Sequence, residues 1–231
     1  DSFHNNPHAL DFLPLFDYNF TFDTDDAEKY KLYFRPLFYS DDYKQIRLDN
    51  SYVDLKYDIA FIGTAHSDRY LISEDISKQA KEIGLKHFSY YYSQGRSVFL
   101  FKSMFDKSFK KFEYKKLSFE SLSHHQIIEI YKNCNYILDI NHPNQKGLTM
   151  RTFETLGAGK KLITTNTAIK KYQIYNSGNI LVINRNNILL DPDFFRKKPE
   201  PLQEEDFYRM SIDGWIDDLF RMDTEKYNWF L

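Results

Sequence analysis

Between residues 57 and 92 the chain reads as a strand, a polar loop, a helix and a second strand in direct succession. Tyr57–Ile62 is a compact apolar strand that stops at Gly63, and His87–Tyr92 is the next strand. The segment between them has a helical apolar spacing and ends at Gly84; its apolar positions are Ile72, Ile76, Ala80 and Ile83. This order predicts a βαβ unit, and therefore an α/β fold with a Rossmann-like parallel sheet flanked by helices.

A second informative run extends from Gly147 to Asn166. Its short helix is expected to begin after Thr149, whose side chain can cap it by accepting a hydrogen bond from a free N–H group. Gly157 or Gly159 can end the helix, because glycine accepts the left-handed conformation. The amino terminus of this helix is a natural place for a phosphate, since free N–H groups and the helix dipole favour an anion.

Two polar loops are expected at the carboxyl ends of parallel strands, where open α/β sheets bind ligands. Gly63 lets the backbone approach a ligand closely, and hydroxyl, imidazole and guanidinium groups can donate to phosphate oxygens. The first loop supplies Gly63, Thr64, His66, Ser67 and Arg69, and the second supplies Gln145, Gly147 and Thr149. The alternative for the first loop is that Ser67 or Asp68 only caps the following helix.

Arg151 and Glu154 are three residues apart and share a helix face. In the functional interpretation, Arg151 neutralises a diphosphate and the Glu154 carboxylate accepts two hydrogen bonds from a ribose diol. The alternative is an exposed ion pair worth only about 0.2–0.5 kcal/mol. The spacing does not decide between the two.

Three common ligand motifs are absent or have a simpler explanation. A P-loop ending at Gly159-Lys160 would need glycine at 154 and serine or threonine at 161, where the chain has Glu154 and Lys161. No G-x-G-x-x-G follows a strand, so the dinucleotide fingerprint is missing. Asp23-Thr24-Asp25 has the Asp-x-Asp spelling of a metal-bound sugar-diphosphate site, but we favour a helix cap there, since a capping box is predicted from Asp25 to Glu28.

The composition limits the partners, metal sites and cellular compartments that we expect for the protein. With 31 basic and 33 acidic residues in 231, bulk charge does not favour nucleic acid as a partner. The single cysteine, Cys134, excludes an internal disulfide and a cysteine-based zinc site, and no metal site is expected. No apolar run approaches the roughly 20 residues of a membrane span, and no signal peptide opens the chain. We expect a cytoplasmic protein, and because the first residue is Asp1 we expect further sequence upstream.

Residues 96–116 combine an apolar helix face with seven basic residues. The apolar positions are Val98, Phe101, Phe105, Phe109 and Phe112. The favoured interpretation is an ordinary amphipathic helix packed on the sheet with its lysines in solvent. The alternative is a peripheral contact with an anionic membrane, with the apolar face down and the lysines at the head groups.

The strand and loop of residues 57–69 and the run 147–166 resemble the nucleotide-binding half of GT-B glycosyltransferases, in particular bacterial enzymes of lipopolysaccharide and capsular polysaccharide assembly. The resemblance implies a nucleoside-diphosphate sugar as donor and a glycan or lipid-linked acceptor, with no metal or other cofactor. It implies that Glu154 holds the donor ribose, that Arg151 and Thr149 meet the diphosphate, and that the Gly63 loop faces the same phosphates. A catalytic residue is not assigned.

The resemblance also divides the chain. Residues 1–40 correspond to the end of an N-terminal domain, 41–56 to a linker, 57–200 to the nucleotide-sugar-binding domain, and 201–231 to a tail whose helix packs back on the N-terminal part. Many retaining members have a second glutamate eight positions before Glu154, where this chain has Lys146, so neither a retaining nor an inverting outcome is implied. Most of an N-terminal domain is missing from the chain, which leaves open a non-catalytic nucleotide-sugar-binding half that acts only with a partner chain. The expected location of the protein is the cytoplasm, and the alternative is a peripheral position at the cytoplasmic face of the inner membrane.

Overall fold

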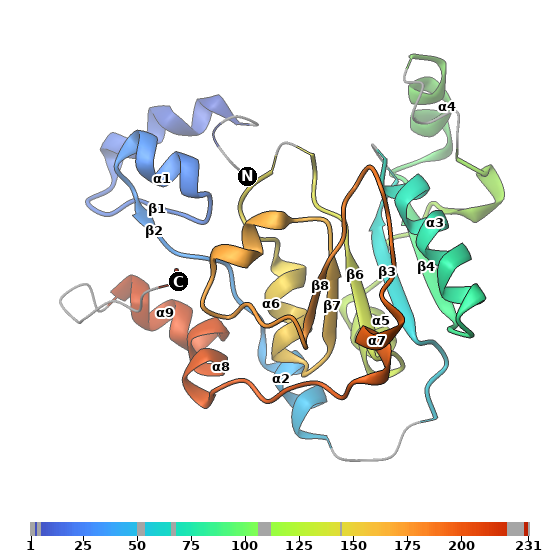
Figure 1. Cartoon of the computed structure of the whole chain (residues 1–231). Coiled ribbons are helices and arrows are strands. Elements are labelled where there is room, and N and C mark those ends of the chain that lie inside the picture. Colours follow the sequence, from blue (N-terminus) through green and yellow to red (C-terminus); the bar gives the residue numbers. More distant parts are fainter. Residues whose placement is uncertain are drawn as a thin grey trace.

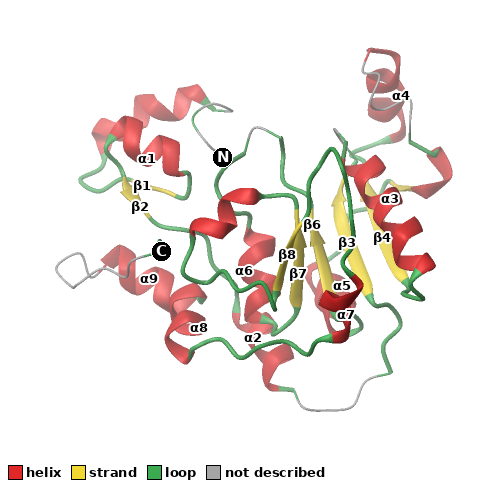
Figure 2. Ribbon diagram, in the orientation of Figure 1, coloured by secondary structure: helices red, strands yellow, loops and turns green. Residues whose placement is uncertain are grey.

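A computed structural model describes residues 3, 6–49, 54–65, 68–105, 112–143, 145–220 and 229–230. Its centre is a six-stranded sheet in which every neighbouring pair is parallel, with the order β5-β4-β3-β6-β7-β8. Figure 1 shows this sheet in the middle of the molecule, and Figure 2 shows helices on both of its faces. The strands are β3 (Ile59–Thr64), β4 (His87–Tyr92), β5 (Leu117–Ser118), β6 (Tyr136–Asp139), β7 (Lys161–Thr164) and β8 (Ile180–Val182).

The core forms two layers, because successive residues of each strand point to opposite faces. In β6, Ile137 packs in one cluster, whereas Tyr136 and Leu138 pack in the other. Helices α5 (His124–Lys132) and α6 (Met150–Gly157) cover the first face, and α3 (Arg69–Glu82) and α7 (Pro192–Arg196) cover the second. The central strands are buried on both sides, as is usual for parallel sheets. The predicted fold class is confirmed.

The strand order reverses between β3 and β6, because the chain leaves β3 towards β4 and β5 and then returns to β6 on the other side. This reversal is the position at which open α/β sheets form a crevice outside the carboxyl ends of their strands. The two loops singled out in the sequence follow these two neighbouring strands. The strand after Gly84 is found as predicted at His87–Tyr92, whereas β3 does not stop at Gly63 but continues to Thr64.

The helix α6 begins and ends where its sequence predicts. Thr149 is in the N-cap position, the helix ends at Gly157, and Gly159 has a left-handed φ of 66°. Helix α5 begins with a complete capping box, in which Ser123 and Gln126 bond each other's backbone N–H groups.

Residues 41–56 differ from the expected linker, because they open with helix α2 (Asp41–Leu48). Tyr43 and Ile46 are three residues apart and form a narrow buried face against α5 and α6. The rest of the helix is polar or charged except for the exposed Leu48, so the segment has little apolar periodicity although it is part of the core.

Before α2, the chain forms a small unit that lies beside the carboxyl ends of the strands (Figure 1). Its elements are η1 (Pro7–Leu15), β1 (Phe20–Thr21), α1 (Thr24–Tyr30) and β2 (Tyr33–Phe34), with β1 and β2 parallel. The Asp23 carboxylate accepts hydrogen bonds from the N–H groups of Asp25 and Asp26 at 3.0 and 3.3 Å. The Asp-x-Asp sequence is therefore a helix cap, as favoured, although the cap is Asp23 and the helix begins before the predicted box at Asp25.

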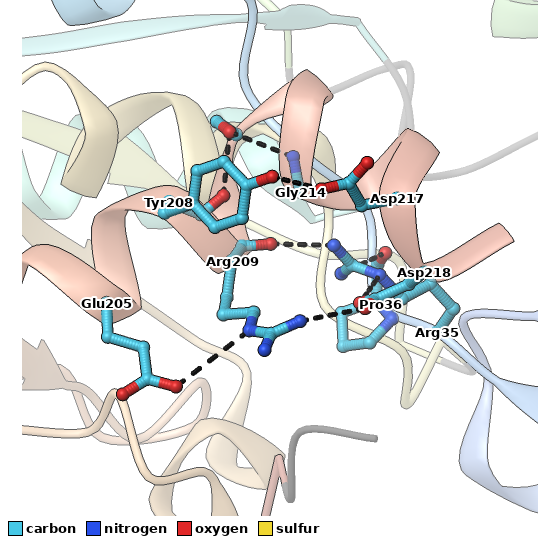
Figure 3. Close-up of polar contacts among 9 residues, drawn as sticks. Arg35, Pro36, Glu205, Tyr208, Arg209, Gly214, Asp217 and Asp218 are labelled. Carbon is cyan, nitrogen blue, oxygen red and sulfur yellow. Dashed lines mark hydrogen bonds and ion pairs between the residues drawn. The ribbon is translucent and has the colours of Figure 1, made fainter. Parts of the chain in front are cut away.

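The C-terminal helices α8 (Glu204–Met210) and α9 (Ile212–Phe220) contact this N-terminal part. Figure 3 shows the Arg35 guanidinium between them: its Nε lies 2.7 Å from Asp218 Oδ2, and its Nη2 donates to the Arg209 carbonyl at 2.6 Å. Tyr39 pairs with Ser211 in a parallel β-bridge.

Helix α4 (Arg96–Phe105) does not pack through the face that its sequence pattern suggests. Phe99 is buried, whereas Phe101 and Phe105 are 65% and 73% exposed. Phe112 is also buried, and beyond it lie η3 (Tyr114–Lys116) and β5. The expected packing of the Val98, Phe101 and Phe105 face on the sheet is therefore wrong; Phe109 lies outside the described residues. The helix stands away from the sheet (Figure 1), and Phe101 and Phe105 on its apolar face are not covered by any element of the described residues.

Candidate functional site

The Thr149 side chain at the start of α6 does not cap the helix. Its hydroxyl donates to Asp139 Oδ2 at 2.8 Å, and the Thr152 hydroxyl donates to the same oxygen at 3.5 Å. The predicted cap bond is therefore wrong, although the N-cap position is right. The physical reason is the buried carboxylate at the end of β6, because a hydrogen bond to an ionised acceptor is stronger than one from a backbone amide to a hydroxyl.

Asp139 accepts hydrogen bonds from Thr149 and Thr152 and lies near Arg69 and Arg151, although no motif in the sequence identifies it as part of a site. Its side chain is buried. Burial raises its pKa, whereas Arg151, Thr149, Arg69 and Thr152 act in the opposite direction. The available signal was a lone carboxylate at the end of an otherwise apolar strand, Tyr136–Asp139.

Arg151 lies in the interior, and its Nη1 atom has no hydrogen-bond partner among the described residues. Burial lowers its pKa, but Tyr131, Asp139 and Glu154 outweigh that effect, and the net shift is upward. The guanidinium therefore remains charged. A buried donor without a partner has a large desolvation cost, and an anion in reach of Nη1 would relieve it.

Glu154 is half-buried and is held by two tyrosines rather than by a single ion pair. The Tyr131 hydroxyl lies 3.4 Å from Glu154 Oε2, and Tyr43 of α2 bonds the same carboxylate. Burial raises the pKa of Glu154, and Arg151 and the two tyrosines oppose this rise. An ionised carboxylate has about four lone-pair positions, so two remain for a diol. The exposed ion pair of the alternative interpretation is not what the structure contains.

Arg69 comes from the loop after β3, at the first residue of α3. Its Nε donates to the Ile140 carbonyl at 2.8 Å, which brings it to the end of β6. Burial lowers its pKa; Asp139 raises it, and Arg151 and Arg185 lower it further. Arg69 is therefore close enough to two other guanidinium groups, those of Arg151 and Arg185, to be repelled by both at the switch point of the sheet.

Arg185, the third of these, follows β8 and was not predicted. Its Nη1 lies 2.5 Å from Asp68 Oδ1, and its Nη2 donates to the carbonyl and to Oδ1 of Asn141 at 2.6 and 3.0 Å. The same nitrogen also donates to Thr165 Oγ1 at 3.2 Å. One side chain thus joins the loops that follow β3, β6, β7 and β8.

Among the glycines, Gly63 and Gly147 have tightly packed surroundings. A Cβ atom at Gly63 would lie 2.6 Å from Cζ of Phe61, and one at Gly147 would lie 2.7 Å from the ring of Phe22. Gly147 thus lets the second loop touch the N-terminal unit. The space beside each glycine that we expected a ligand to use is occupied by an aromatic ring of the chain itself.

The remaining predicted residues are distributed differently. Thr64 is exposed at the end of β3. Gln145 donates from Nε2 to the Gly147 carbonyl at 3.2 Å. His66 and Ser67 lie outside the described residues. Within the described ranges, no group of three or more His, Cys, Asp or Glu side chains is placed to hold a metal ion.

A cavity of about 380 Å³ opens between the N-terminal unit and this edge of the sheet. Gln145 and Arg185 line it, together with Lys146, which forms an ion pair with Asp25. Arg151 and Glu154 do not line it and lie on the α5 side of α6, beside Tyr131. The predicted residues therefore divide the candidate site into two parts. One is open to the cavity next to Arg185, and the other lies in the interior around Asp139 and Glu154.

The fold has counterparts among solved structures. No protein-family model matches the chain, and no curated protein matches it. An α-glucosyltransferase in complex with UDP and a 13-mer DNA containing a central A:G mismatch is similar, with a TM-score of 0.60 and 12% identity. The similarity covers 90% of this chain and 64% of that one, so this chain spans less than two thirds of its length.

A second structure is the catalytic domain of starch synthase IV from Arabidopsis thaliana bound to ADP and acarbose. It has a TM-score of 0.33 and 11% identity, covering 81% of this chain and 38% of that chain, and it carries no weight here. The similarity to the α-glucosyltransferase concerns the fold: the chain has an α/β fold like that of this glycosyltransferase.

Proposed function

We propose that this chain is the donor-binding part of a glycosyltransferase that takes a sugar from a nucleoside diphosphate. The observation that supports this most is the group of three arginines, Arg69, Arg151 and Arg185, at the switch point of a glycosyltransferase-like sheet. Guanidinium groups bind phosphate oxygens bidentately, and a diphosphate needs several of them. The similar α-glucosyltransferase was solved with UDP.

Leaving-group stabilisation is the chemistry that these residues can supply. When the bond from the sugar to the diphosphate breaks, negative charge grows on the departing phosphate. Arg69 and Arg185 would face that charge from the loops. Arg151 and the N–H groups at the start of α6 would face it from that helix. Glu154 would use its remaining lone pairs for the ribose diol, while Tyr43 and Tyr131 keep the carboxylate in place.

The acceptor that we propose is a bacterial surface glycan, of the lipopolysaccharide, capsule or exopolysaccharide type. Its support is the sequence resemblance of residues 57–69 and 147–166 described above. The alternative is a half-enzyme that binds the nucleotide sugar and acts only with a partner chain. Assays of sugar transfer and of donor hydrolysis, with this chain alone and with cell extract added, separate the two functions.

Nucleotide binding is the first test of the proposal. A screen of nucleoside diphosphates by thermal shift identifies the base, since a ligand that binds only the folded state raises its stability. Calorimetry with the best nucleotide then compares Arg151→Met with Arg96→Met, a change of an exposed arginine on α4. Loss of binding in the first variant alone supports the site, and equal affinities in the two would contradict it.

We also propose a peripheral membrane contact through α4. The helix exposes Leu100, Phe101, Met104 and Phe105 by 56–73%, and the rings of Phe101 and Phe105 lie 4.9 Å apart. Residues 96–116 carry seven basic and two acidic residues, which suits an anionic lipid surface. No helix in the described part of the chain is long and apolar enough to cross a bilayer. Binding at the surface would place the protein beside a lipid-linked acceptor at the cytoplasmic face of the inner membrane.

A further inference from the structure

A second cavity, of about 430 Å³, lies at the opposite edge of the sheet, where β6 and β7 begin. Its lining combines two basic runs that are distant in sequence with an arginine of α2. The basic residues are Arg47, Lys160, Lys161, Arg196, Lys197 and Lys198, and none of the described aspartates or glutamates lines it. The whole chain has a net charge of −2, so this concentration of positive charge is local.

The fold holds the two basic runs together through Lys161. Its Nζ is buried and donates to the Phe194 carbonyl at 2.5 Å and to the Lys197 carbonyl at 3.0 Å. Two of its three N–H donors therefore join β7 to the end of α7. The side chain of Lys160, the neighbouring residue, has no hydrogen bond or ion pair with the other described residues.

The other cations of the cavity are only partly neutralised. Arg47 pairs with the exposed Glu204 at 3.1 Å, and Arg196 pairs with Asp193 at 3.0 Å. Arg47 also stacks on the Phe207 ring at 3.7 Å, and its Nε atom is buried without a hydrogen-bond partner in the described structure. Lys197 and Lys198 have no ion-pair partner among the residues that the structure describes.

We propose that this cavity binds a phosphate-bearing ligand with at least two negative charges. An edge that gathers more cations than carboxylates lowers its own electrostatic energy when a multivalent anion enters. Lys160 and the Nε of Arg47 are the donors that lack partners, and Lys197 and Lys198 stand at the mouth. The cavity lies at the edge opposite to the donor site, so the inference does not rest on the proposed function.

Phosphate of this kind has two sources, a soluble phosphorylated metabolite or a lipid head group. Amine footprinting distinguishes them: the protein is treated with acetic anhydride, and modification of Lys160 is measured by mass spectrometry. One arm adds inorganic pyrophosphate, and the other adds vesicles of phosphatidic acid in phosphatidylcholine. Protection of Lys160 in either arm supports the inference and names the source; modification that is unchanged in both arms overturns it.

A paired binding measurement makes the result independent of the footprint. Calorimetry with inorganic pyrophosphate compares Lys160→Ala/Lys198→Ala with Lys78→Ala/Lys81→Ala, two exposed lysines of α3. The cavity variant is expected to weaken one binding event about tenfold or more, because two charge-assisted contacts are removed, and the α3 variant is expected to match the wild type. Equal losses in both variants would indicate a general charge effect and would contradict the proposal. Nucleoside diphosphate binding should be the same in all three proteins, whatever the outcome for the cavity.

Discussion

Arg185 Nη1 lies 2.5 Å from Asp68 Oδ1, so a residue that follows the last strand of the sheet is paired with the residue that precedes helix α3. The two are 117 positions apart in sequence. Through this pair and its bonds to Asn141, Arg185 fixes the relative position of four loops at the edge where the donor diphosphate is proposed to bind.

Replacing Arg185 with methionine should weaken nucleoside diphosphate binding by about tenfold or more. The change removes one phosphate donor and the ties among the loops, each a charge-assisted contact. Calorimetry with the nucleotide identified by thermal shift measures the effect. Arg96→Met, on the exposed side of α4, is the matched control, and a wild-type dissociation constant in Arg185→Met would exclude the residue from the site.

Glu154→Gln should distinguish the contribution of the ribose to binding from that of the diphosphate. Glutamine keeps the size and one acceptor for Tyr43 and Tyr131, but it cannot accept both hydroxyls of a diol while serving them. Affinity for the nucleoside diphosphate is therefore expected to fall, whereas affinity for inorganic pyrophosphate stays within twofold or so. Parallel losses for both ligands would show that Glu154 acts only by holding Arg151.

His87 should make stability depend on pH between about 4 and 6.5. Burial lowers its pKa to about 4, and its Nε2 atom is buried without a hydrogen-bond partner in the described structure. Between this value and the unfolded pKa of about 6.5, the unfolded state binds more protons, so stability falls as the pH is lowered from 6.5 to 4. The loss is expected to be up to about 3 kcal/mol. Urea unfolding of the wild type and His87→Phe at several pH values tests this, since the wild type should lose stability relative to the variant as the pH falls from 6.5 to 4.

Gly157→Ala should destabilise the protein by about 1–3 kcal/mol, although alanine is the better helix former. A Cβ atom at residue 157 would lie 2.4 Å from the ring of Tyr39. That ring is buried and its hydroxyl donates to the Phe207 carbonyl at 2.8 Å, so it cannot move away freely. Gly95→Ala, where the nearest atom is 3.9 Å away, should lose less stability in the same thermal unfolding experiment, because only the N-cap preference for glycine at the start of α4 is lost.

Phe101→Ser/Phe105→Ser should abolish co-sedimentation with vesicles of phosphatidylglycerol and phosphatidylcholine. The two changes remove the exposed rings that would enter the lipid, and they leave the basic residues unchanged. Leu189→Ser, at a 68% exposed position elsewhere, is the control and should sediment like the wild type. Undiminished sedimentation of the double variant would rule out α4 as the contact.

The sequence predicts secondary-structure elements correctly where capping residues, glycines and apolar periodicity agree. The strand His87–Tyr92 and the end of α6 before Gly159 follow from residues that are close in sequence. These features determine the parallel sheet and the location of the two loops at its switch point.

Other features depend on contacts that no local pattern reports. Arg185 meets Asn141 across 44 residues, and nothing in its own neighbourhood identifies it as part of the site. Helix α2 needs only Tyr43 and Ile46 to enter the core, which is too few for a recognisable period. For α4 the period is visible, but periodicity tells which residues share a face and not whether another element covers that face.

The bond from Arg35 to the Arg209 carbonyl spans 174 positions of the chain. Its consequence concerns synthesis: the segment around Arg35 and Tyr39 leaves the ribosome long before its partners in α8 and α9 exist. Long-range closure of this kind is slow, and until it occurs the early segment exposes apolar side chains that aggregate readily. The sheet can assemble meanwhile, so the last step of folding should be the meeting of the two ends of the chain.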